Sequence, residues 1–183
     1  HLTILVFLVI YILQKNYEFI GYAAAALALF WLVLYFYKRY EIPFIVIVGF
    51  SIWLFLHMLG GTTINGIWMY GLMLINIVGE PFFILKYDQL IHFYCYLVVG
   101  AILFYIMKKE AIRITRTVLF LAIIAGIGVG ALNEIFEFSM VLFLANTGVG
   151  DYYNTSLDLV FNAVGAIVGV LTANYYDKKQ FNK

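Results

Sequence analysis

Long apolar stretches, separated by short polar segments, make up most of this chain. They do not alternate with polar residues, so they predict helices and not the strands of a barrel. A helix of about 20 apolar residues crosses a bilayer with its backbone groups satisfied internally. The predicted spans are residues 2–13, 19–37, 44–59, 87–107, 117–144 and 156–176. The pattern therefore predicts an all-α, polytopic transmembrane helical bundle of about six spans, in a single domain over residues 1–183.

Residues 64–79 are apolar but do not fit this pattern. Asn65, Gly66, Gly71 and Asn76 interrupt the segment, and it is short for a span. We expect a short interfacial or re-entrant segment here.

Composition supports placement in a membrane. Hydrophobic residues make up 65% of the chain and charged residues 11%, whereas roughly 25% of the residues in a soluble domain are charged. The mean hydropathy is +0.98. Because Cys95 is the single cysteine, an internal disulfide and a cysteine-based zinc cluster are both excluded.

The basic residues predict the orientation. With six spans, one end of the bundle, here called the basic end, holds loops 38–43 and 108–116 and the tail from residue 177. Its basic residues are Lys38, Arg39, Lys108, Lys109, Arg113, Arg116, Lys178, Lys179 and Lys183. Only Lys15 and Lys86 fall at the opposite, acidic end. By the positive-inside rule, we expect a multi-pass protein of the cell membrane with cytoplasmic N- and C-termini.

Polar residues inside the spans form helical stripes. Asp88, His92 and Tyr96 follow the spacing i, i+4, i+8 on the fourth span. Glu134 and Glu137 continue a stripe from Gly130 on the fifth span, and Asn133 lies beside them. On the sixth span the stripe comprises Asp158, Asn162, Gly165 and Gly169.

All these polar groups lie toward the acidic end, as do His57 near the end of the third span and Asp151 in the last loop. Charged groups within a bilayer normally face the bundle interior. We therefore predict a polar cavity open to the acidic end. Tyr96, Asn133, Asn162 and Asp151 are expected to line it.

Histidine together with carboxylates is a credible ligand set for a divalent metal: zinc, manganese or magnesium. The candidate ligands are His57, Asp88, His92 and Asp158, and the candidate catalytic groups are Glu134 and Glu137. Simpler interpretations exist. His57 and His92 would then be interfacial histidines, Asp158 would cap the sixth helix with Ser156, and Asn162 would only join helices.

Two other features carry no site. Gly126-x-Gly128-x-Gly130 follows no strand and lies within an apolar helix, so it is not a dinucleotide fingerprint. Gly126/Gly130 and Gly165/Gly169 are instead expected to be helix-packing faces. The abundant aromatic residues indicate lipid contact and interface belts, and no nucleic acid partner is expected.

The ordered motifs resemble a known family. Tyr87-Asp88-x3-His92-Phe93, Asn133-Glu134-x2-Glu137, Asp151, Asp158-x3-Asn162-x2-Gly165-x3-Gly169 and His57-x2-Gly60-Gly61 are similar to uncharacterised YjdF-type membrane proteins. The chain resembles more distantly the VanZ-like family, associated with glycopeptide resistance, but lacks the Arg of that family before Asp158. The resemblance covers about residues 43–172. It implies a small multi-pass helical protein with an acidic/His cluster and no settled activity.

Three functions are compatible with these features. The first is a metal-dependent hydrolase or transferase acting on a lipid or lipid-linked envelope substrate from the acidic end. The second is a proton- or ion-coupled transporter of small solutes that uses Glu134 and Glu137. The third is a non-catalytic membrane binding protein whose cluster only holds the bundle together. The lipid bilayer is the expected partner in each case, and the oligomeric state stays open.

Overall fold

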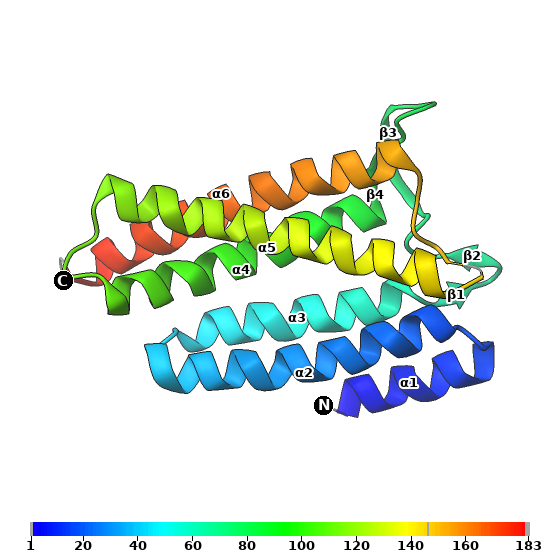
Figure 1. The fold of residues 1–183 in the computed structure, drawn as a ribbon, viewed down its shortest axis with the longest axis horizontal. Coiled ribbons are helices and arrows are strands. Elements are labelled where there is room, and N and C mark those ends of the chain that lie inside the picture. The colour runs from blue at the N-terminus through cyan, green and yellow to red at the C-terminus, as the bar shows by residue number, and fades with distance from the viewer. Residues whose placement is uncertain (1, 146, 182–183) are drawn as a thin grey trace.

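The computed structural model describes residues 2–145 and 147–181, which fold into a helical bundle with a small β region at one end (Figure 1). The helices are α1 (Leu2–Gln14), α2 (Tyr17–Tyr40), α3 (Phe44–Gly60), α4 (Tyr87–Glu110), α5 (Arg116–Phe143) and α6 (Tyr152–Phe181). The strands are β1 (Thr63–Ile64), β2 (Ile67–Trp68), β3 (Met73–Val78) and β4 (Ile84–Lys86). The predicted all-α polytopic membrane bundle is confirmed.

Among the residues that the structure describes, four helices are long and apolar enough to cross a membrane: α2, α4, α5 and α6. The other two, α1 and α3, are apolar but shorter, with 13 and 17 residues. At 1.5 Å per residue, α1 is only about 20 Å long, less than the ~30 Å hydrocarbon core. In Figure 1, α1 begins partway along the bundle and ends at the β region. The six predicted helices are therefore present, but α1 does not reach the length of a span.

Side-chain caps define where several helices begin. The Asn16 side chain accepts a hydrogen bond from the Phe19 backbone N–H, and Thr115 does the same for Val118. Asp151 accepts from the Asn154 N–H at 3.0 Å and precedes the first residue of α6. The expected start of the sixth span at Ser156 is thus wrong, because α6 begins one turn earlier. Asp158 consequently lies inside the helix and is not its cap.

Residues 63–86 form two antiparallel hairpins at the acidic end. In the first, Ile64 pairs with Ile67. The connecting Asn65 and Gly66 both have positive φ, 52° and 79°, as a two-residue type I′ turn requires. Asn-Gly, taken above as an interruption of an apolar segment, is thus a hairpin signal. In the second hairpin, β3 pairs with β4. Residues 64–79 contain strands and no spanning helix.

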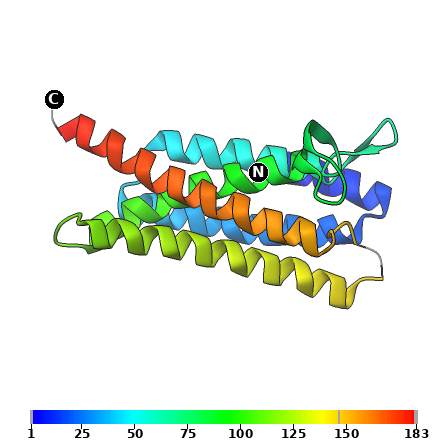
Figure 2. The same ribbon diagram turned by 90° about the horizontal axis from the view of Figure 1, so that it is seen from above.

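The closest helix packing joins α4 and α6, which lie side by side in both views (Figures 1 and 2). A Cβ atom at Gly165 would overlap the Phe93 carbonyl, and one at Gly169 would overlap the Leu97 carbonyl. On α5, a Cβ atom at Gly126 would overlap the side-chain methyl of Ala166 on α6. The predicted packing faces are confirmed, and they fix the register of α4 against α6.

The basic end is joined by ion pairs. Lys108 Nζ lies 2.6 Å from Asp177 Oδ1, which connects α4 to α6. Lys109, also on α4, pairs with Glu41, which lies between α2 and α3. The Lys109 ammonium holds the pKa of this exposed carboxyl below its usual range. The C-terminal ends of α4 and α6 and the turn between α2 and α3 lie at the end opposite the β region (Figure 1). Two lysines of α4 are therefore paired with carboxylates at this end.

Gly169→Ala tests the α4–α6 contact, and Gly128→Ala is the matched control because nothing lies within 4 Å of a Cβ at Gly128. Overpacking costs about 1–3 kcal/mol, and a fixed backbone partner leaves little room for relief. We expect Gly169→Ala to lower the midpoint of thermal unfolding in detergent. Gly128→Ala should leave it unchanged or raise it, since Ala is the better helix former. Equal midpoints for the two variants would contradict the packing described here.

Candidate functional site

His92 is the centre of a buried polar cluster between α4, α5 and α6. Its side chain is 8% exposed. Its Nε2 lies 3.4 Å from Asp88 Oδ1 and 3.8 Å from Glu137 Oε1. Its Nδ1 lies 2.9 Å from Asn162 Oδ1 and 3.5 Å from Glu134 Oε1. Three helices thus bring their predicted stripes to one imidazole.

Each carboxylate in the cluster is held by an asparagine amide. Asn162 Nδ2 donates to Glu134 Oε1 at 3.1 Å, and Asn133 Nδ2 donates to Glu137 Oε1 at 2.8 Å. Asn154 Nδ2 donates to both aspartates, to Asp158 Oδ2 at 2.6 Å and to Asp88 Oδ2 at 3.0 Å. Amide donors orient carboxylates without neutralising them, so the negative charge of the cluster stays uncompensated by these contacts.

The hydrogen bonds of Asn162 set the tautomer of His92. Because the Asn162 amide nitrogen donates to Glu134, its oxygen faces His92 Nδ1 as an acceptor. Nδ1 must then carry a proton, and a neutral imidazole has its lone pair on Nε2. That lone pair points toward Asp88 and Glu137. Lone pair and carboxylates repel unless a proton or a cation lies between them.

Asp158 is the most deeply buried carboxylate of the cluster. The residue is 1% exposed, and its Oδ1 is buried without a hydrogen-bond partner among the residues that the structure describes. A buried carboxylate oxygen of this kind is costly. Two groups place one potential ligand atom per residue within 4.8 Å of one another: Asp88, His92 and Asp158, and His92, Glu134 and Glu137.

His57, also predicted as a ligand, lies outside both of these groups. Its ring stacks on Trp53 with centroids 5.2 Å apart, and its Nδ1 lies 2.5 Å from the Tyr70 hydroxyl. Burial raises the pKa of the Tyr70 hydroxyl well above its usual range. Tyr70 therefore stays protonated and donates to His57, which fixes the imidazole in the wall of the cleft beside the cluster.

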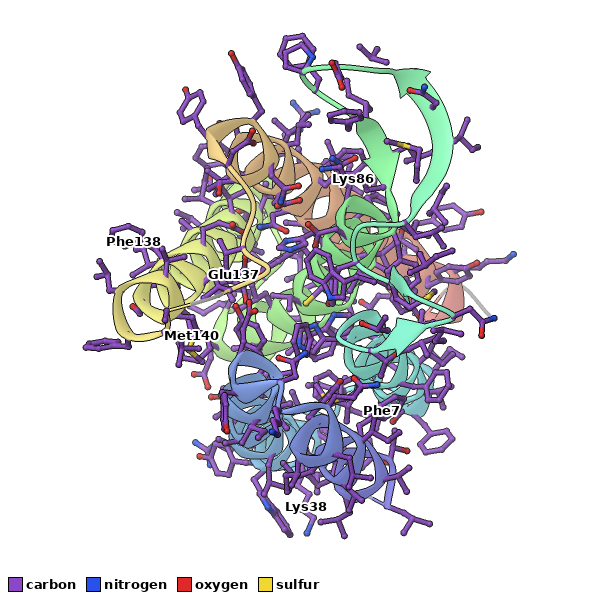
Figure 3. All side chains as sticks on the ribbon, turned by 90° about the vertical axis from the view of Figure 1, so that its right-hand side faces the viewer. Phe7, Lys38, Lys86, Glu137, Phe138 and Met140 are labelled. Atoms are coloured by element: carbon purple, nitrogen blue, oxygen red, sulfur yellow. The ribbon has the colours of Figure 1, made fainter. Side chains whose placement is uncertain are left out.

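A cleft of about 50 Å³ leads to the cluster from the acidic end, enough room for a few water molecules. Asp88, His92, Tyr96, Asn133 and Glu137 line it, together with His57. Figure 3 shows Glu137 on the side of α5 that faces the other helices, and the neighbouring Phe138 on the outside. Asp151 lies outside this cleft and lines a second pocket between α5 and α6.

Two polar residues of the site were missed by the sequence interpretation. Asn154 lies four residues before Asp158 and so continues the Asp158/Asn162 stripe by one turn. The sequence interpretation missed it because the sixth helix was expected to begin only at Ser156. Glu18 is buried on α2, where it accepts from the Tyr22 hydroxyl and from the Gly148 backbone N–H. Glu18 thereby connects α2 to the loop after α5. The two residues of this contact are 130 positions apart, so no local sequence pattern could predict it.

The comparisons with known proteins identify the family. The family described as predicted membrane protein (DUF2238) matches residues 1–179, nearly the whole chain. No curated protein and no solved structure matches the chain. The chain belongs to the DUF2238 family of predicted membrane proteins.

Tyr70→Phe tests the anchoring of His57. Removing the hydroxyl leaves a buried imidazole nitrogen without its donor, which costs about 1–3 kcal/mol. We expect a lower thermal unfolding midpoint in detergent, measured by circular dichroism. Tyr175→Phe, which removes the hydroxyl of a side chain that is 62% exposed, should leave the midpoint unchanged. A similar loss in both variants would mean that the Tyr70–His57 contact stabilises nothing.

Proposed function

We propose that this member of the DUF2238 family is a membrane enzyme that holds one divalent cation at Asp88, His92 and Asp158, and hydrolyses or transfers part of a lipid or lipid-linked envelope substrate. The observation that carries the proposal is the buried Asp158 Oδ1 without a hydrogen-bond partner, in a group where Asp88, His92 and Asp158 each place one potential ligand atom within 4.8 Å of the others. A cation would bind this oxygen and balance the negative charge of the carboxylates.

The surroundings of His92 support this ligand set. A metal-bound histidine normally donates its other N–H to a carboxylate or carbonyl, which fixes the ring, and Nδ1 here meets Asn162 in that manner. Three protein ligands leave coordination positions open, as in catalytic zinc sites. One histidine with two aspartates suits zinc or manganese. The alternative is magnesium, a hard cation that prefers oxygen ligands.

Glu137 and Glu134 fit the role of general base. Bound in this site, the cation would lower the pKa of water and polarise a substrate oxygen. Glu137 lines the cleft beside His92 and is oriented by Asn133, so it is placed to accept a proton from water entering there. Glu134 lies on the other side of the imidazole, next to Nδ1.

Orientation follows from charge. The lysines and arginines of the loops between α2 and α3 and between α4 and α5 lie at the basic end. We assign this end and the C-terminus to the cytoplasm by the positive-inside rule, so that the cleft opens to the extracytoplasmic side.

A transporter is the second candidate, and the helix packing argues against it. Between the cluster and the basic end, the α4 backbone touches α6 at Gly165 and Gly169. Such contact leaves no polar route through this interface. A non-catalytic binding protein would keep the cluster for stability alone, and it predicts that removing a ligand residue unfolds the chain.

Metal binding tests the proposal. We expect about one divalent ion per chain from elemental analysis of protein purified in detergent, and saturable binding of zinc or manganese in calorimetry. A ligand at 100 times its Kd stabilises the folded state by about 2.7 kcal/mol, so the ion should raise the unfolding midpoint.

Asp158→Asn is the diagnostic variant, because it removes the charge and keeps the shape. It should lose binding while remaining folded without metal, since it replaces an unsatisfied carboxylate. Asp151→Asn is the control: Asn is an equally good cap, and Asp151 belongs to neither ligand group. Absence of metal from the parent protein, or equal losses in both variants, would refute the metal-dependent function.

A further inference from the structure

The hairpin of β3 and β4 is an apolar element outside the helical bundle. Five of its large apolar side chains are exposed: Leu74, Ile75, Ile77, Val78 and Phe82. The segment 73–84, which contains most of both strands and the turn between them, holds one charged residue, Glu80. Exposed apolar side chains gathered in one element mark a contact with a membrane or with another protein.

The hairpin extends sideways from the bundle. In Figure 1 it rises beside the start of α6, across the direction of the helices, and in the end-on view of Figure 3 its strands reach beyond the helices. The surface of a membrane that contains the helices is roughly perpendicular to them. A hairpin with this direction therefore runs along the membrane surface and not out into the water.

Contacts with two helices fix the level of the hairpin. The backbone N–H of Tyr87, the first residue of α4, donates to the Leu72 carbonyl at 2.8 Å. Phe82 packs edge-on against Tyr153, in the first turn of α6, with ring centroids 5.3 Å apart. Both α4 and α6 are long enough to span a membrane. The hairpin thus lies where two spanning helices begin, which is the membrane boundary at the acidic end.

The backbone limits how deep the hairpin can lie. Among the residues that the structure describes, β3 and β4 form a two-stranded sheet, so the outer edge of each strand has N–H and C=O groups without a partner strand. Open sheet edges do not occur in the hydrocarbon core, because nothing there satisfies them. Water and lipid head groups satisfy them in the interface. The depth that suits both the apolar side chains and the open edges is therefore the interface.

We infer that the β3–β4 hairpin is an interfacial anchor, which lies on the membrane surface at the acidic end. Alternation along a strand places Ile75 and Ile77 on one face and Asn76 on the other. The face of Ile75 and Ile77, which are 61% and 62% exposed, lies against the upper acyl chains, and Asn76 faces the water. Because the one charge is the acidic Glu80, apolar contact holds the hairpin there, and attraction to anionic lipid does not.

The anchor holds the mouth of the cleft at the membrane boundary. Trp68 and Tyr70 precede the hairpin, Asp88 follows it, and all three line the cleft. A hairpin fixed in the interface therefore places the cleft where water and lipid head groups meet. This role needs no bound cation, so it does not depend on the proposed function.

Fluorescence quenching tests the position of the hairpin. Ile77→Cys, Ile112→Cys and Leu132→Cys are each made in a Cys95→Ser background, labelled with the fluorophore NBD and reconstituted in phosphatidylcholine liposomes. Ile112, in the loop between α4 and α5, is the water control, and Leu132, near the middle of α5, is the hydrocarbon control; both are exposed on the protein. We expect iodide to quench the probe at residue 77 severalfold less than the probe at residue 112.

Lipids that carry a nitroxide define the depth. The probe at residue 77 should be quenched best by a nitroxide near the head group, and the probe at residue 132 by a nitroxide near the end of the acyl chain. A probe at residue 77 that is as open to iodide as the one at residue 112 would overturn the anchor, as would chain-end quenching equal to that at residue 132. Shielding that grows with the protein-to-lipid ratio would show contact between copies and would also overturn it.

Two variants test which face meets the lipid, with the probe now on Ile75→Cys. Ile77→Asp adds a charge to the face assigned to lipid and should open the probe to iodide. Asn76→Asp is the matched control, which adds the same charge to the face assigned to water and should leave the quenching unchanged. Equal quenching in the two variants would overturn the assignment.

Thermal unfolding in detergent separates loss of the anchor from loss of the fold. Ile77 is exposed, so Ile77→Asp should have the unfolding midpoint of the parent. A lower midpoint would show that the side chain packs within the protein and would overturn its role as a lipid contact.

Discussion

A cluster of carboxyl groups buried within a membrane bundle is the constraint on which the rest of this structure depends. Asp88, Glu134, Glu137 and Asp158 surround one imidazole, and burying such groups is unfavourable unless they are paired or bound to a cation. The amides of Asn133, Asn154 and Asn162 hold the carboxylates in place but leave their charge. The ammonium of Lys86 bonds to the Asn154 oxygen, one step away from the aspartates.

The glycines of α4 and α6 make this arrangement geometrically possible. With backbone against backbone at Gly165 and Gly169, α6 lies close enough for Asn162 to bond both His92 and Glu134. The same contact closes the bundle between the cluster and the basic end. Toward the acidic end, α5 and α6 diverge and leave a pocket on the outside of the bundle. The polar cluster is therefore closed toward the basic end and is reached from the acidic end through the cleft.

Much of this could be predicted from the sequence, because lipid restricts the backbone to helices and helical spacing places polar residues on faces. The stripes Asp88/His92 and Asp158/Asn162 indeed converge. Long-range and turn-dependent features could not be predicted so well. In the sequence, His57 and His92 look alike, since each is a histidine within an apolar stretch. In the structure, Tyr70, from the segment between α3 and α4, binds His57, which lies outside the two ligand groups. The start of α6 at Tyr152 depends on a cap from Asp151 that was assigned to a loop.

The distribution of the cluster along the chain has a consequence for biosynthesis. Its residues all follow Asp88, so the three N-terminal helices enter the membrane without them. Helix α5 brings Glu134 and Glu137 before α6, with Asn162 and Asp158, has been made. A charged residue near a helix centre costs about 2.5–3.5 kcal/mol during insertion, which the strongly apolar remainder of α5 must offset. Helix α6 is therefore made after the helices whose polar groups it completes, and a chain stalled before α6 would present Glu134 to the lipid without the Asn162 amide that binds it in the folded bundle.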